Sequence, residues 1–214
     1  VHGQIYLTDD VTAETVKLVE NSYRDVNIAF ANELSRICDT LGVNPWEVIR
    51  LAGQHPRVKI LSPGPGVGGH CIAVDPWFLI EKAPRVSPLL RAARMVNDAM
   101  PGHIVARLER GLARHRIRRA RIACLGVTYK ADVDDIRESP ALAVVRRLQR
   151  RHIVRVHDPR VSDVPGIVFT ELEKAVAGAD CLVVLVDHSS YKSVPLTRLV
   201  RRMRRPFLLD TRGI

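Results

Sequence analysis

The feature that most constrains the fold is a change in hydrophobic period near the middle of the chain. Before residue 116 apolar residues recur every three or four positions, as on helices, whereas the runs after residue 119 are short and rich in β-branched residues and Leu. Strands that alternate with helices predict a doubly wound parallel sheet. We therefore predict an α/β chain with a helical domain at 1–118 and a doubly wound domain at 119–214. The predicted strands are 121–127, 153–157, 181–186 and 206–210, with helices at 140–151 and 171–177 between them.

The first half predicts three helices. Residues 11–41 contain no Gly or Pro and stop at Gly42, so they predict one long amphipathic helix. Asn44 before Pro45 predicts the start of a short helix over 45–53, and Ser87 before Pro88 predicts a long helix to about residue 114 with a kink at Pro101. The apolar stripe of the first helix comprises Val16, Val19, Tyr23, Val26, Phe30, Leu34 and Ile37.

Composition excludes several classes of function. The net charge of +10 could indicate a polyanionic partner, but only six of the 33 basic residues are Lys and they are not interleaved with aromatic residues, so we expect no nucleic-acid partner. No apolar run reaches the ~18 residues that span a bilayer, and the first residues lack a signal peptide, so we expect a cytoplasmic protein without membrane contact. The four cysteines lack metal-site spacing, so we expect free thiols and no metal.

The Gly- and Pro-rich segment 62–69 is the strongest local motif. It contains GxGxxG at 64–69. A dinucleotide fingerprint follows a strand and opens a helix, whereas here Pro65 lies inside the motif and CIAVDP follows at 71–76, so we do not interpret it as such a fingerprint. Its glycines let a ligand approach backbone N–H groups closely, and a plain surface turn is the alternative. Cys71 follows, with Asp75 four residues on, and a thiol near amides and a carboxylate is a candidate nucleophile. The other thiols are predicted to be buried: Cys38, Cys124 and Cys181.

Polar residues on one helix face and at strand ends are further candidates. Lys17 and Asn21 lie one turn apart, where a cation and an amide could stabilise an alkoxide and hold a water, although a solvated stripe is the alternative. Lys130 and Arg137 follow the first predicted strand, and Arg212 follows the last. The crevice beyond the carboxyl ends of parallel strands is where such sheets bind ligands, so these cations predict an anionic ligand. Isolated surface charge is the alternative for each.

Three segments, in order, resemble the nucleotide-sugar 6-dehydrogenases, which comprise the UDP-glucose, GDP-mannose and UDP-N-acetylhexosamine dehydrogenases. They are KLVEN at 17–21, GGHCIAVDP at 68–76, and Tyr129-Lys130 followed by DIRESP at 135–140. Within the family, PGPGVGGHCIAVDPWFL at 63–79 most resembles the UDP-N-acetyl-D-mannosamine branch. The resemblance implies a central helical domain that forms a homodimer and a C-terminal UDP-binding domain. It also implies a preceding NAD-binding Rossmann domain, which we expect to be missing here.

The resemblance further implies an NAD-dependent, four-electron oxidation of the sugar C6 to a uronic acid. Cys71 would capture the aldehyde as a thiohemiacetal, whose oxidation gives a thioester that water hydrolyses. Lys17 would stabilise the oxyanions and Asn21 would help to place the water. Asp75 would act as a base or orienting group for that water.

Substrate and cofactor contacts are implied by the same resemblance. Arg57 would reach the substrate of the neighbouring subunit, and Arg137 would contact NAD. The chain alone would then be inactive. A UDP-binding dimerisation module without redox activity, and a UDP-GlcNAc or UDP-glucose 6-dehydrogenase, are the alternatives. The implied contacts to the UDP-sugar in the chain's own cavity are Ser62, Gly64, Gly66, Gly68, Tyr129, Lys130 and Arg212.

Overall fold

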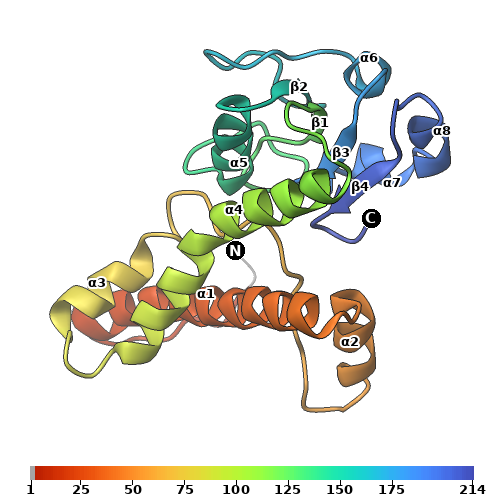
Figure 1. The fold of residues 1–214 in the computed structure, drawn as a ribbon. Coiled ribbons are helices and arrows are strands. Elements are labelled where there is room, and N and C mark those ends of the chain that lie inside the picture. Colours follow the sequence, from red (N-terminus) through yellow and green to blue (C-terminus); the bar gives the residue numbers. More distant parts are fainter. Residues whose placement is uncertain (1–2) are drawn as a thin grey trace.

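A computed structural model describes residues 3–214 and has a helical end and a sheet end (Figure 1). The helical end contains α1 (Asp10–Leu41), α2 (Pro45–Ala52) and α3 (Asp75–Lys82). The long helix α4 (Pro88–Arg114) connects the two ends, packing against α1 and α3 with its first half and against the sheet with its second. The predicted long helices are therefore present, and α4 belongs to both ends.

The sheet end is a doubly wound α/β unit. Its four strands are all parallel and lie in the order β2-β1-β3-β4. The second half of α4 and α5 cover one face, and α6 and α8 cover the other. This architecture confirms the predicted fold class. The elements are β1 (Arg121–Leu125), α5 (Pro140–Gln149), β2 (Ile153–His157), α6 (Leu172–Val176), β3 (Cys181–Val184), α7 (Ser189–Lys192), α8 (Leu196–Val200) and β4 (Phe207–Asp210).

The two central strands explain why the apolar runs in the sequence are nearly continuous. In β1, Ile122 faces the core formed by α4 and α5, and the next residue, Ala123, faces the core formed by α6 and α8. Both faces of the strand are therefore dry, and each buried Val, Ile or Leu contributes about 1.5–3 kcal/mol. The strand order reverses between β1 and β3, so a ligand-binding crevice is expected beyond their carboxyl ends.

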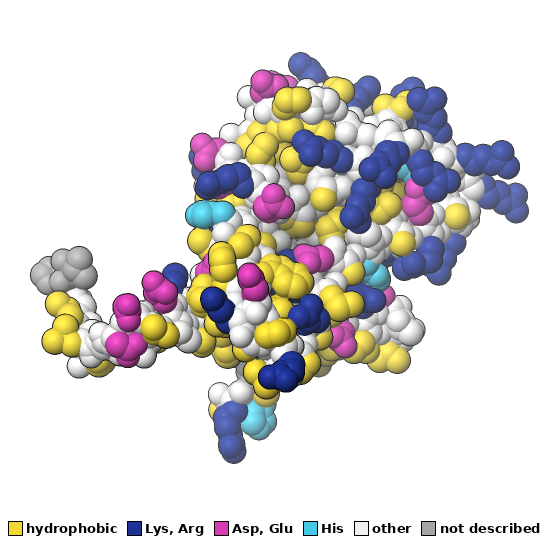
Figure 2. All heavy atoms as spheres, turned by 90° about the vertical axis from the view of Figure 1, so that its left-hand side faces the viewer, with side chains coloured by type: hydrophobic (Ala, Val, Ile, Leu, Met, Phe, Trp, Pro, Cys, Tyr) yellow, Lys and Arg dark blue, Asp and Glu magenta, His cyan; other side chains and the backbone are white. Residues whose placement is uncertain are grey.

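The buried residues of α1 are four polar side chains and three small apolar ones, which the apolar pattern did not predict. The helix begins at Asp9, whose carboxylate accepts a hydrogen bond from the Thr12 N–H at 2.9 Å, and it ends at Gly42 with φ 72°. Five members of the predicted apolar stripe are exposed instead, and Figure 2 shows exposed hydrophobic side chains over the helical end. These five are Val16, Val19, Tyr23, Phe30 and Ile37. The residues turned toward the rest of the chain include Asn21, Ser22, Asp25 and Asn32.

Several local features differ from the prediction or extend it. Helix α3 was not predicted, because eight residues give too few turns for a period; its signal was Pro76 in the first turn. Strands β1 and β3 each end two residues before the predicted limit. Pro101 lies inside α4, and Figure 1 shows the helix axis changing direction between the α1 side and the sheet side. Within residues 3–214 no helix is both long enough and apolar enough to cross a membrane.

Two half-buried histidines predict a pH-dependent stability. Burial lowers the pKa of His103 and of His157 below the ordinary 6.5, although nearby carboxylates oppose the shift. Below pH 6.5 the unfolded chain therefore binds more protons than the folded chain, so the stability rises with pH in that range. We expect the free energy of unfolding to fall as the pH drops from about 7 to about 5.5, as measured by urea denaturation. A His103→Gln/His157→Gln variant should have a smaller slope, and an unchanged slope would contradict the prediction.

Candidate active site at the carboxyl edge of the sheet

A cavity of about 340 Å³ lies between α1, the Gly-rich loop and the carboxyl ends of β1, β3 and β4. This is the crevice expected at the reversal of strand order. The cavity brings together residues that are far apart in the sequence, from α1 to the end of β4. Seven of the eight predicted substrate contacts line it: Ser62, Gly64, Gly66, Gly68, Tyr129, Lys130 and Arg212.

The Gly-rich loop is packed tightly into the wall of the cavity. A Cβ at Gly68 would lie 2.5 Å from the Glu138 carbonyl oxygen and 2.8 Å from Cδ of Pro140, so no larger residue fits. Gly66 has φ 132°, a conformation that other residues rarely adopt. The Gly69 N–H donates to the Arg137 carbonyl at 3.1 Å. These contacts exclude the alternative of a plain surface turn. Among the described residues the first strand is β1, and the helix after the loop, α3, starts only at Asp75, so the GxGxxG pattern here is not the strand-to-helix turn of a dinucleotide fold.

Three cations line the cavity from three different elements. Lys130 follows β1, Arg212 follows β4, and Arg24 comes from α1. Arg212 Nε donates to Asp187 Oδ1 at 2.8 Å, and its Nη1 donates to the Pro63 carbonyl at 3.1 Å. The excess of positive charge suits a ligand with two phosphate groups.

Arg24 was missed by the sequence analysis, although a signal was available. It lies three residues after Asn21 and seven after Lys17 on α1, so the three share one helical face. Ile28 continues the same face and also lines the cavity. A search for further polar residues on the Lys17–Asn21 face would therefore have found Arg24.

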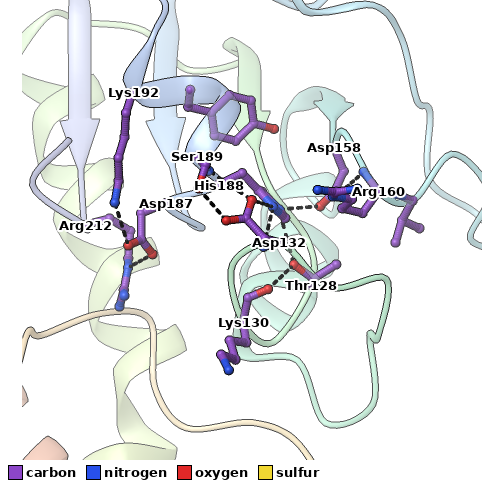
Figure 3. A network of polar contacts seen from close by, with 12 residues as sticks. Thr128, Lys130, Asp132, Asp158, Arg160, Asp187, His188, Ser189, Lys192 and Arg212 are labelled. Atoms are coloured by element: carbon purple, nitrogen blue, oxygen red, sulfur yellow. Dashed lines mark hydrogen bonds and ion pairs between the residues drawn. The ribbon is translucent and has the colours of Figure 1, made fainter.

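A buried hydrogen-bond network supports the strand ends behind Lys130 (Figure 3). His188 is fully buried, and its Nε2 lies 3.3 Å from Asp158 Oδ2 and 3.3 Å from Thr128 Oγ1. The Thr128 hydroxyl donates to the Lys130 carbonyl at 2.8 Å. The Asp132 N–H donates to His188 Nδ1 at 3.0 Å, so the ring proton is on Nε2 and is donated toward Asp158.

Asp158 is the acceptor at the centre of this network. Burial raises the pKa of its carboxyl group, but hydrogen bonds from His188 and from the backbone N–H groups of Val127 and Arg160 outweigh burial, so the pKa is lowered overall. The Val127 N–H lies 2.7 Å from Oδ2, where β1 gives way to the Lys130 loop. Asp158 and His188 were not predicted from the sequence. Their positions one and two residues after predicted strands were the available signal.

Three of the four candidate catalytic residues lie at or beside the start of α3. Cys71 is partly exposed, and its carbonyl accepts a hydrogen bond from the Asp75 N–H at 2.8 Å. Asp75 Oδ2 in turn accepts a hydrogen bond from Asn21 Nδ2 at 2.6 Å, which joins α3 to α1. Lys17 lies one turn before Asn21, exposed, with its Nζ 3.1 Å from Glu20 Oε2. Asp75 is thus joined to Cys71 through the backbone and to Asn21 through its side chain, while Lys17 is paired with its own helix. None of these four residues lines the cavity itself.

The remaining thiols are buried, as predicted. Cys38, Cys124 and Cys181 all lie in the interior. Burial raises the pKa of Cys124 to about 12 and that of Cys181 well above its ordinary value, so neither forms a thiolate near neutral pH. Among residues 3–214 no group of His, Cys, Asp and Glu side chains converges as a metal site.

Two predicted contacts lie outside the cavity. Arg57 is exposed in the segment after α2 and does not line the cavity of its own chain. Arg137 is also exposed, and its guanidinium is paired with Asp135 at 2.6 Å. The carbonyl of Arg137 accepts a hydrogen bond from the Gly69 N–H, two residues before Cys71, so Arg137 borders the loop that carries the thiol.

The chain matches a known protein family. Residues 11–99 match the central domain, and residues 123–214 the UDP binding domain, of the UDP-glucose/GDP-mannose dehydrogenase family. The chain is 48% identical to an NDP-N-acetyl-D-galactosaminuronic acid dehydrogenase of Ralstonia solanacearum and 45% identical to a UDP-N-acetyl-D-mannosamine dehydrogenase of Yersinia pestis. All of the chain aligns, and it covers 51% and 53% of these relatives, so it spans about half their length.

Solved structures agree with the sequence comparison. The structure of a UDP-D-ManNAc dehydrogenase from Pyrococcus horikoshii superimposes with a TM-score of 0.92 at 44% identity, over 100% of this chain and 51% of that one. A UDP-N-acetyl-mannosamine dehydrogenase from Staphylococcus aureus gives 0.86 at 40% identity, over 100% of this chain and 50% of that one. The chain therefore belongs to the UDP-glucose/GDP-mannose dehydrogenase family, and it contains that family's central and UDP-binding domains.

Proposed function

We propose that this chain is the substrate-binding and thiol-bearing half of an NAD-dependent dehydrogenase that oxidises UDP-N-acetyl-D-mannosamine at C6 to the uronic acid. The observation that carries the proposal is the cavity at the carboxyl edge of the sheet. Cations and a tightly packed Gly-rich loop line it, and Ile72, the neighbour of Cys71, forms part of its wall. A nucleotide diphosphate in this cavity would thus lie next to the segment that carries the thiol.

The UDP moiety would be bound by charge and by backbone. Arg24, Lys130 and Arg212 supply three positive charges, against the single carboxylate of Asp187 that also lines the cavity. Arginine and lysine both bind phosphate oxygens by charge-assisted hydrogen bonds, and these strengthen inside a partly dry cleft. The close approach of backbone at the Gly-rich loop would let the sugar and phosphates lie against main-chain atoms.

The chemistry would proceed through Cys71. After oxidation of the C6 alcohol to the aldehyde, the Cys71 thiolate adds to the aldehyde carbon, forming a C–S bond as the carbonyl electron pair moves to oxygen. Lys17 would stabilise that oxyanion. Loss of a second hydride gives the thioester, and a water held by Asn21 and Asp75 then adds to the acyl carbon. The C–S bond breaks, releasing the acid and restoring the thiol.

NAD would accept the hydride in each of the two oxidations when bound. In this chain Arg137 is the proposed contact to it, because this exposed cation borders the loop of Cys71. The one GxGxxG segment forms the substrate loop, so the dinucleotide fold is proposed to lie in the half of the longer relatives that this chain does not span. The chain alone is then expected to bind UDP without catalysing turnover.

A homodimer would explain the exposed face of α1. Tyr23 and Phe30, 69% and 57% exposed, lie on one side of the helix with other apolar residues. Large exposed apolar patches are typical of protein interfaces, and we propose that a second copy covers this one. Arg57, exposed and outside its own cavity, would then be free to reach the substrate of the partner.

The four free thiols support the expected reducing, cytoplasmic location.

The first test is calorimetric titration of the chain with UDP. We expect binding, and we expect Lys130→Ala to weaken it by about tenfold or more, because a hydrogen bond to a charged group contributes about 1.5–3 kcal/mol. Lys174→Ala, an exposed lysine on α6, is the matched control and should bind as the unsubstituted chain does. Unchanged affinity in Lys130→Ala would contradict the proposed cleft.

The same titration distinguishes the sugars. The relatives act, by their names, on N-acetylmannosamine or N-acetylgalactosaminuronic acid derivatives of a nucleotide. We expect UDP-N-acetylmannosamine to bind more tightly than UDP-N-acetylgalactosamine, UDP-N-acetylglucosamine or UDP-glucose. Preference for one of these other sugars would leave the dehydrogenase proposal in place and change its substrate.

A further inference from the structure

A buried chain of hydrogen bonds leads from the interface of α1 and α4 to the wall of the cavity. The Gly64 N–H donates to Asn32 Oδ1 at 2.9 Å, and Asn32 Nδ2 donates to Asn97 Oδ1 at 2.9 Å. Asn97 Nδ2 donates to Asp25 Oδ1 at 2.8 Å and to the Asp25 carbonyl at 3.1 Å. Asn32 and Asp25 are 0% exposed and Asn97 is 1% exposed, so water does not compete for these bonds.

The donor-to-acceptor direction of this hydrogen-bond network is fixed by the group at its acceptor end, Asp25. Arg94 Nη1 donates to Asp25 Oδ1 at 2.6 Å. Burial raises the pKa of Asp25, and the Arg94 charge offsets only part of that rise. Because a guanidinium only donates, Oδ1 of Asp25 is an acceptor. The backbone carbonyl of Asp25 also only accepts, so Asn97 must turn its NH₂ toward Asp25 and its oxygen toward Asn32. Asn32 must then turn its NH₂ toward Asn97, which leaves its oxygen for the Gly64 N–H.

The Pro63–Gly64 peptide is hydrogen-bonded on both sides. The last hydrogen bond of the network reaches its N–H, and a residue of the sheet end reaches its carbonyl. The carbonyl of Pro63 accepts a hydrogen bond from Arg212 Nη1 at 3.1 Å, on the other side of the Pro63–Gly64 peptide. Asn32 therefore fixes the N–H of this peptide from α1, and Arg212 fixes its carbonyl from β4. A rotation of the peptide would break both bonds and leave the Arg212 guanidinium held by Asp187 alone in the cavity wall.

We propose that Asp25, acting through Asn97 and Asn32, is a positioning residue that sets the Pro63–Gly64 peptide and thereby the place of Arg212 in the UDP cavity. This inference rests on the proposed function, because it takes the cavity as the UDP site. Asp25 itself contacts no substrate: it orients two amides, and the second amide orients the loop. The competing explanation is that the network only fastens α1 to α4.

The test removes one link and reads the loop directly. Asn32→Leu keeps the shape of the side chain but removes both hydrogen bonds. We expect hydrogen exchange at the Gly64 amide, measured by NMR, to accelerate by about tenfold or more while β1 and β3 amides stay protected. We expect UDP affinity, measured by calorimetry on the same samples, to fall about tenfold. Asn97→Leu breaks the chain one link earlier and should give the same two changes, which keeps the test open if Asn32→Leu does not fold.

A control variant and a double-mutant cycle distinguish positioning of the Pro63–Gly64 peptide from simple attachment of α1 to α4. Ser22→Ala is the control, because Ser22 is 4% exposed on α1 and its hydroxyl has no partner within the described part of the chain; its UDP affinity should be unchanged. Asp25→Asn should weaken UDP binding alone but add nothing in the Asn32→Leu background. Independent, additive effects would overturn the proposal, as would normal UDP affinity in Asn32→Leu. If the unsubstituted chain fails to bind UDP, the proposed function fails first and this inference with it.

Discussion

A Cys71→Ser variant of the complete dehydrogenase is expected to lose uronic acid formation by at least about a thousandfold while still binding the UDP-sugar. Serine keeps the size of the side chain, but its hydroxyl is a far weaker nucleophile than a thiolate near neutral pH, so neither the thiohemiacetal nor the thioester forms. The cavity lining does not include the Cys71 side chain, so the affinity for UDP should stay within about twofold. NADH formation and calorimetry measure the two quantities.

Cys38→Ala is the control, because it removes a buried thiol of α1 that lies outside the site. It should retain turnover, and turnover in Cys71→Ser at the control's level would remove Cys71 as the nucleophile. A second measurement needs no turnover. Iodoacetamide should alkylate Cys71 first in the native chain, because the other three thiols are buried. Modification of Cys124 at an equal rate would contradict the assigned environments.

The fold was predictable where a local pattern has one physical reading. The apolar runs of β1 and β3 are nearly continuous because both faces of each strand are covered, and such runs indicate a parallel sheet. The stripe on α1 shows the limit of this reasoning. A period of 3.6 identifies residues that share a face, but it does not tell whether the same chain or a second copy covers that face. Here the chain packs the polar side of α1 inward and leaves Tyr23 and Phe30 exposed.

The site was predictable where topology alone brings residues together. Lys130 and Arg212 each follow a strand, and all strands of a parallel sheet end at the same edge, so their meeting follows from strand assignment. Asn32 and Asn97 are separated by 65 residues, and no local pattern indicates that their side chains meet. Their pairing depends on how α1 crosses α4, which the sequence pattern leaves open. Asparagine in a predicted helix otherwise indicates exposure.

Removal of the Asp158 carboxylate is expected to cause the largest loss of stability. Oδ2 accepts hydrogen bonds from Val127 N–H at 2.7 Å and from His188, while Oδ1 accepts from the N–H groups of Arg160 and Val161 at 2.8 and 3.1 Å. An Asp158→Ala variant leaves the Val127 N–H without a partner in the interior and removes one partner of the buried His188, whereas the Arg160 and Val161 N–H groups are only partly buried. An unmade buried hydrogen bond costs about 1–3 kcal/mol, so the two together cost about 3–5 kcal/mol. We expect a decrease of this size in the free energy of unfolding, measured by urea denaturation.

The pH dependence of the stability provides a second, independent test of the role of Asp158. The pKa of Asp158 is lowered below the ordinary 3.8, so its contribution is present above that pH and is lost as the pH falls through the folded-state value. Asp158→Ala should therefore reduce the acid-induced loss of stability below about pH 4. Asp163→Ala is the matched control, since Asp163 is an exposed carboxylate in the same connection, and it should change stability by less than about 0.5 kcal/mol. If Asp158→Ala proved as stable as Asp163→Ala, the strand ends would be held by the sheet alone, and the network behind Lys130 would have no part in shaping the cavity.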